Sequence, residues 1–137
     1  MDTTNLIHSL LHHLSAVFTR ESDQILQEQL GIGFSQYKIL TSLQDSPAIQ
    51  QRHIAVNLGQ TEASISRQVK LLHKKGMLTS RVSPRNRRVH LIALTPKGER
   101  IAEAAQNVLR NYQHGSLEHM NSKQQAHLLE LLAQVHA

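Results

Sequence analysis

Residue types that define several other protein classes are missing from this chain of 137 residues. It has no cysteine, which excludes a disulfide framework, a thiol nucleophile and thiol-based redox sensing. It has no tryptophan and only 3% aromatic residues, so a core must come mainly from Leu, Ile, Val and Ala. No apolar run approaches the roughly 18 residues of a membrane span, and the N-terminus lacks the pattern of a signal peptide. We therefore expect a soluble, cytoplasmic protein.

Positive charge is concentrated in the middle of the chain. Residues 49–100 contain 11 Lys and Arg but only two Asp and Glu, a net charge of +9, whereas the remaining residues together carry −4. The length fits a single domain. The overall charge of +5 indicates an acidic partner, either a nucleic acid or an anionic membrane surface.

Hydrophobic periodicity predicts long amphipathic helices at both ends of the chain. The first covers residues 4–30 and ends at Gly31. The last two cover residues 96–112, after the N-cap Thr95, and residues 122–135. Because the apolar faces of the terminal helices have no core of their own to cover, we expect them to pack against a second copy of the chain.

Three shorter helices and a hairpin are predicted between these ends. The helices cover residues 34–44, 50–58 and 61–75, and the strands cover residues 77–82 and 89–94 around a turn at 84–87. On the third short helix the expected buried residues are Ala63, Ile65, Val69, Leu72 and, at the edge, Leu71. The predicted fold class is mainly α: a winged helix-turn-helix with a two-stranded wing and long N- and C-terminal dimerisation helices.

Polar side chains on the exposed face of the third short helix suit the base edges and phosphates of a DNA major groove. Arginines in the wing suit the concentrated negative potential of a narrow minor groove. The alternatives are an ordinary solvated helix face and an ordinary exposed loop. The candidate DNA-binding residues are Thr61, Ser64, Ser66, Arg67, Gln68, Lys70, Arg81, Arg85, Arg87 and Arg88.

These elements, in this order, resemble the MarR family of winged-helix transcription regulators. The matching residues are Gln36-Tyr37 with Leu40, Ile54-Ala55 with Leu58-Gly59, Ser66-Arg67 with Val69 and Leu72, Lys75-Gly76 with Leu78, Arg87-Arg88, and Leu94-Thr95-Pro96-Lys97-Gly98. The resemblance covers residues 32–98 and, through the flanking helices, nearly the whole chain. It implies a homodimer on a palindromic operator, with recognition helices in successive major grooves and wings, each led by Arg88, in minor grooves.

The resemblance also divides the single MarR-like domain of residues 1–137 into functional parts. Residues 1–31 and 97–137 are expected to be dimerisation helices, and residues 32–96 the DNA-binding region. The expected dimer-interface residues are Ile7, Leu10, Leu11, Leu14, Leu128, Leu132 and Val135. A small-molecule effector is implied between the two parts, and no cofactor is expected.

Three positions depart from the family pattern. Asn86 and Ser83 stand where the family commonly has acidic residues that brace the wing, which predicts a more mobile, more basic and less selective wing. Gly33 replaces a usual Thr cap, at a cost of a few tenths of a kcal/mol.

Metal binding and catalysis find little support. His8 and His12 are spaced to share a zinc ion, but no Cys and no His-Glu-x-x-His pattern accompanies them, so no metal site is predicted. Protonation of the ten histidines at low pH would add positive charge and tighten non-specific DNA binding. No glycine-rich phosphate loop is present, and Glu99 and Glu103, four apart on a helix, are interpreted as a solvated face, so the chain is not predicted to be an enzyme.

The sequence thus predicts a dimeric, sequence-specific regulator of transcription that binds double-stranded DNA, a repressor released by a small-molecule effector. Two alternatives remain open. One is a non-specific or architectural DNA-binding protein, which the neutral wing residues Ser83 and Asn86 favour slightly. The other is a winged-helix module that binds proteins, against which the retained arginines argue.

Overall fold

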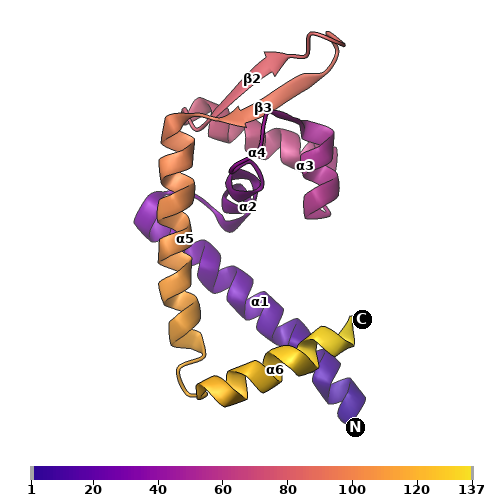
Figure 1. Cartoon of the computed structure of the whole chain (residues 1–137), viewed down its shortest axis with the longest axis vertical. Coiled ribbons are helices and arrows are strands. Elements are labelled where there is room, and N and C mark those ends of the chain that lie inside the picture. Colours follow the sequence, from indigo (N-terminus) through magenta and orange to yellow (C-terminus); the bar gives the residue numbers. More distant parts are fainter. Residues whose placement is uncertain (1, 137) are drawn as a thin grey trace.

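The structure, a computed structural model, describes residues 2–136. Its elements are α1 (Thr3–Leu30), α2 (Phe34–Ser42), β1 (Ile49–Gln50), α3 (Gln51–Leu58), α4 (Glu62–Lys74), β2 (Leu78–Val82), β3 (His90–Leu94), α5 (Pro96–Ser116) and α6 (Ser122–Val135). Figure 1 shows the β2–β3 hairpin at one end of the molecule and both termini towards the other, with α5 extending between them and α1 reaching as far as α2. The predicted winged helix-turn-helix with long terminal helices is confirmed.

Capping residues explain where most of the helices begin and end. Thr61 Oγ1 accepts a hydrogen bond from the Ser64 amide at 3.1 Å, and Thr95 Oγ1 accepts one from the Gly98 amide at 3.0 Å. Gly31 adopts a left-handed conformation with φ of 68°, which few other residues tolerate, and ends α1. These boundaries agree with the sequence-based predictions because each cap acts within one helical turn.

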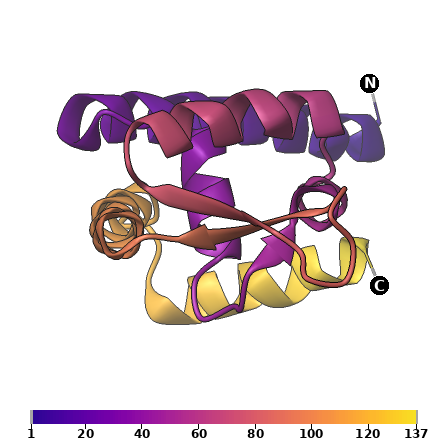
Figure 2. The same ribbon diagram turned by 90° about the horizontal axis from the view of Figure 1, so that it is seen from above.

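The sheet has three strands rather than the two predicted. Its order is β1-β3-β2, all antiparallel, with Ile49 opposite Ile92 and Leu78 opposite Leu94. The two predicted strands of the wing are present as β2 and β3, and β1 was missed because two residues are too few to show the alternation that marks a strand. In the view of Figure 2 the hairpin lies alongside α4.

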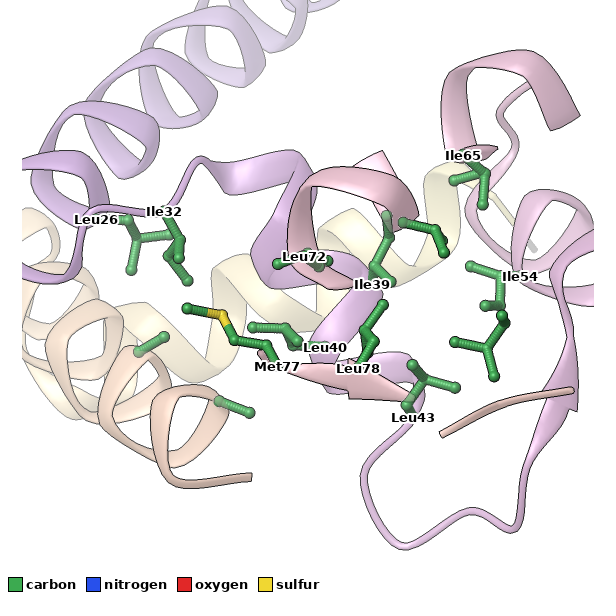
Figure 3. Packing of buried hydrophobic residues seen from close by; sticks show 14 of the residues in the cluster. Leu26, Ile32, Ile39, Leu40, Leu43, Ile54, Ile65, Leu72, Met77 and Leu78 are labelled. Atoms are coloured by element: carbon green, nitrogen blue, oxygen red, sulfur yellow. The ribbon is translucent and has the colours of Figure 1, made fainter. Parts of the chain in front are cut away.

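The core lies within the winged region and includes residues from both long helices (Figure 3). Its fully buried large side chains are Leu26, Ile32, Ile39, Leu40, Ile54, Ile65, Leu72, Ile92 and Leu109. The prediction that Ala63 and Leu71 face this core is wrong, since both are exposed. At about 100° per residue they lie well outside the arc that Ile65, Val69 and Leu72 define.

Helix α2 receives its N-terminal cap from α1. The carboxylate Oδ1 of Asp23 accepts a hydrogen bond from the Phe34 amide at 2.8 Å. A Cβ atom added at Gly33 would lie 3.0 Å from this same oxygen. The glycine that replaces the usual Thr cap therefore makes room for a capping group supplied 11 residues earlier.

The two ends of the chain are much less buried. Helix α6 has no buried residue among those described, and α1 buries only Ser22 and Leu26. Helix α5 continues to Ser116, four residues beyond the predicted end, because Gly115 keeps a helical conformation instead of ending the helix. Within residues 2–136, none of the helices combines the length and the hydropathy needed to cross a membrane.

One polar contact joins the two long helices. The Tyr112 hydroxyl on α5 donates a hydrogen bond to the Glu21 carboxylate on α1. Burial, followed by the hydrogen bond and the charge of Glu21, raises the pKa of Tyr112 to about 12. The tyrosine is therefore protonated, and able to donate, well above neutral pH.

Candidate nucleic-acid interface

The burial of α4 determines which of its side chains face away from the protein. Ile65, Val69 and Leu72 anchor one side in the core. Arg67 and Lys70 lie on the opposite side and are exposed. Helix α4, 13 residues long, is therefore held like a recognition helix with polar side chains facing outward.

A groove separates α4 from the wing. Its walls combine residues of α4, the β2–β3 turn and the start of α3, and its charged or titratable members are Arg52, Glu62, Lys70, His73, Arg85, Arg88 and His90. Four of these side chains are permanently cationic and one is a carboxylate. A surface of this charge favours contact with a polyanion.

The predicted DNA-binding residues divide into two groups. The groove brings together Ser66, Lys70, Arg85 and Arg88, from α4 and from the turn of the wing. The others lie outside the residues that line the groove: Thr61, Ser64, Arg67, Gln68, Arg81 and Arg87. Among these, Ser64 and Gln68 are half-buried, and Thr61 and Ser64 are engaged in the helix cap.

Sequence reasoning missed several groove residues outside α4 and the wing arginines. Arg52 follows directly on β1 and enters the groove from α3, and His73 and His90 face it from α4 and β3. The basic character of Arg52, within the +9 segment, was the available signal. Its position could not be inferred, because β1 was not recognised.

The turn of the wing is held by two short polar side chains. Asn86 Oδ1 accepts a hydrogen bond from the Arg88 amide at 3.0 Å, and Ser83 Oγ accepts one from the Arg85 amide at 3.3 Å. The first hydrogen bond forms an Asx-turn and the second an ST-turn. Residues 83–89 contain no carboxylate, so the turn presents three arginines without an acidic neighbour in the loop.

The predicted dimer residues are largely exposed. Leu11, Leu14 and Leu128 are half-buried in the single chain, whereas Ile7, Leu10, Leu132 and Val135 are exposed. The histidines at positions 8, 12 and 13 are exposed as well. No group of three or more potential metal ligands occurs among residues 2–136.

Comparison with known proteins agrees with this geometry. A family model described as "MarR family" matches residues 30–89. The uncharacterized HTH-type transcriptional regulator YdgJ of Bacillus subtilis is 26% identical over 105 residues, which are 77% of this chain but 64% of that protein. The chain thus spans somewhat less than two thirds of this relative.

Solved structures show the same fold at low sequence identity. Wild-type MarR from E. coli in its apo form has a TM-score of 0.83 and 22% identity, with coverage of 100% of this chain and 98% of that one. The PcaV transcriptional regulator from Streptomyces coelicolor, solved with its natural ligand, has a TM-score of 0.75 and 21% identity, with coverage of 90% and 89%. The family model thus matches the helix-turn-helix and most of the wing, and the fold of the whole chain is similar to that of solved MarR-family regulators.

Proposed function

We propose that this protein is a dimeric, sequence-specific regulator of transcription that binds double-stranded DNA. The observation that carries the proposal is the groove between α4 and the wing. Its lining contains four permanent cations, Arg52, Lys70, Arg85 and Arg88, and one carboxylate. The exposed side of α4 enters a major groove, and the arginine turn follows the backbone into the adjacent minor groove. Phosphate neutralisation supplies affinity, and side chains at base edges supply specificity.

Two copies assemble through the terminal helices. Leu10 on α1 is 56% exposed, and Leu132 and Val135 on α6 are 42% and 59% exposed. Apolar surface of this extent, on helices with little core of their own, favours burial against a second chain. A two-fold dimer presents two α4 helices to a palindromic operator.

Substitution of Leu132 tests this assembly. Leu132→Asp places a charge in the proposed seam, and we expect monomers in sedimentation or light-scattering measurements and the loss of tight operator binding. Glu130→Asp, an exposed acidic position on the same helix, is the control and is expected to remain dimeric. A dimeric Leu132→Asp variant would remove this residue from the seam.

A small-molecule effector releases this repressor from DNA. A hollow between α1 and α2 is lined by His12, Arg20, Asp23, Phe34 and Lys38, among others. The PcaV regulator, which has a similar fold, was solved in complex with its natural ligand, and this supports a ligand site in the present chain. A ligand that prefers one separation of the two α4 helices would shift the equilibrium by its differential affinity.

Binding of the purified protein to its own upstream DNA tests the central proposal. Fluorescence anisotropy would compare that fragment with a scrambled duplex of the same composition at two salt concentrations. We expect a strong preference for the upstream fragment, since non-specific contacts alone cannot discriminate sequences. Equal, steeply salt-dependent affinity for the two duplexes would instead identify a non-specific DNA-binding protein. The absence of carboxylates in the turn at residues 83–89 favours that alternative.

A further inference from the structure

The C-terminal end of α4 is bonded to both long helices through lysine side chains. Lys75, the residue that ends α4, donates a hydrogen bond from Nζ to the carbonyl oxygen of Gly31 at 2.9 Å. Lys97, near the start of α5, donates from its own Nζ to the carbonyl oxygen of Lys75 at 2.8 Å. Lys75 is thus held by α5 through its backbone and reaches the end of α1 through its side chain.

The acceptor at Gly31 is well suited to an ammonium group. The last carbonyls of a helix lack partners within the helix and carry the negative end of its dipole. The last turn of α1 contains no basic residue of its own. Lys75 supplies that cation from a position 44 residues away in the sequence.

A second acceptor fixes the direction of the Lys75 side chain. Gln36 Oε1 lies 3.4 Å from Lys75 Nζ and also accepts a hydrogen bond from the Gly33 amide at 3.3 Å. Gln36 is only 8% exposed, so its amide group is held by the surrounding protein. The ammonium therefore joins α4 to the α1–α2 junction at two points.

We propose that Lys75 is a positioning residue that fixes the recognition helix α4 relative to α1. Because α1 belongs to the proposed dimer seam, the bond to Gly31 sets the separation at which two α4 helices meet DNA; this consequence rests on the proposed function. Lys74, one residue earlier, is exposed on the outward side of α4 and is a candidate phosphate contact. The two adjacent lysines have different roles.

Distance measurements within one chain test the positioning role without DNA. Because the chain has no cysteine, nitroxide labels attach only where a cysteine is introduced. The two chosen positions are Gln24→Cys on α1 and Lys70→Cys on α4. Labelled chains are diluted with unlabelled chains, so that only distances within one chain are recorded. Lys75→Met keeps the aliphatic stem but removes the ammonium, and we expect a broader or shifted α1–α4 distance distribution. Lys74→Met, the matched control, is expected to keep the wild-type distribution.

DNA duplexes with altered half-site spacing test whether Lys75 sets the separation of the two α4 helices. Wild-type protein is expected to prefer one spacing over duplexes lengthened or shortened by one base pair, and Lys75→Met to lose this preference several-fold with an unchanged salt slope. Lys74→Met is expected to keep the preference while its salt slope falls by about one unit. Lys75→Arg, which keeps a charged donor, is expected to restore the preference. A merely structural defect would lower the melting temperature and weaken binding to all spacings equally.

The outcomes separate this inference from the proposed function. A wild-type distance distribution in Lys75→Met overturns the positioning role, whatever the protein binds. A retained spacing preference in Lys75→Met overturns the link to DNA. A salt slope lowered as in Lys74→Met also overturns it and makes Lys75 a phosphate contact. Wild-type protein without any sequence or spacing preference contradicts the proposed function, and the distance measurement then decides the role of Lys75 by itself.

Discussion

The winged region and the terminal helices of this protein differ in how they are stabilised. Leu72, in the winged region, is completely buried, whereas Leu129, on α6, is 70% exposed. The winged region has a core to which α1 and α5 also contribute, while α6 has no fully buried residue among those described. A single chain therefore accounts for the shape of the winged region, whereas apolar side chains of the outer helices stay exposed in it.

Charge divides the chain in a similar way. The segment of residues 49–100, which contains α4 and the wing, carries +9, and the rest of the chain carries −4. One region is thus suited to a polyanion and the other to an apolar partner. The same substitution made in the two regions should consequently have different effects.

Removal of a core side chain should produce the largest effect. Leu72→Ala is expected to lower the free energy of unfolding by about 2–5 kcal/mol, because the deleted atoms leave a cavity. Leu71→Ala, at the neighbouring exposed position, should change it by no more than about 0.5 kcal/mol. Urea unfolding followed by circular dichroism measures both. Similar losses in the two variants would mean that α4 is rotated relative to the burial described above.

Addition of one methyl group to glycine should have opposite effects at the two ends of α5. A Cβ atom at Gly98 would lie 2.1 Å from the Met77 carbonyl oxygen, so the backbone must shift and Gly98→Ala should destabilise by about 1–3 kcal/mol. Gly115 is helical with nothing within 4 Å, so Gly115→Ala should stabilise by up to about 1 kcal/mol. Thermal unfolding of the two variants checks the signs. A stable Gly98→Ala variant would contradict the close approach of the Met77 backbone to α5.

Removal of one arginine from each region tests the division of charge. Arg88→Ala should lower the slope of log affinity against log salt by about one unit, because one phosphate contact is lost. Arg110→Ala, an exposed position on α5, removes the same charge and should leave the slope unchanged. Titrations of one duplex at several salt concentrations provide the slopes. Equal slopes for Arg88→Ala and wild type would remove the wing from the interface.

The smallest expected effect concerns the contact between α1 and α5. With no tryptophan and two tyrosines, absorbance can follow tyrosinate formation directly, and Tyr112→Phe should remove a transition near pH 12. Because the pKa of Tyr112 is higher in the folded chain, its contribution to stability is complete below pH 10 and is lost as pH rises through 12. The variant should therefore lose less stability than wild type over that range. A Tyr112 transition at the ordinary pKa of 10 would contradict the contact with Glu21.

Elements with local signals were predictable from the sequence, and elements that depend on distant residues were not. Thr61, Thr95 and Gly31 act within a turn of their own helices, so their caps were predicted correctly. Strand β1 exists only because β3 lies beside it, and two residues carry no periodicity of their own. The candidate arginines were recognisable by type, but their division between groove and outer surface depends on how α4 and the wing pack.

Two long-range contacts had no sequence signal. The cap that Asp23 provides for α2 and the bond from Lys75 to Gly31 join positions 11 and 44 residues apart. Both lie at the junction of α1 and α2, where the sequence showed only an unusual Gly33. Polar side chains there are typical of a solvated surface, and only the packing of the helices reveals their partners.

The Asp23 cap has a practical consequence for anyone who divides this protein into parts. A fragment that starts at residue 32 contains the complete helix-turn-helix and wing but lacks the group that accepts from the Phe34 amide. It also lacks Leu26, which fills the core beside Ile32 (Figure 3). A minimal DNA-binding fragment must therefore begin before Ser22 and extend past Leu109, so about the last third of α1 and most of α5 have to be retained.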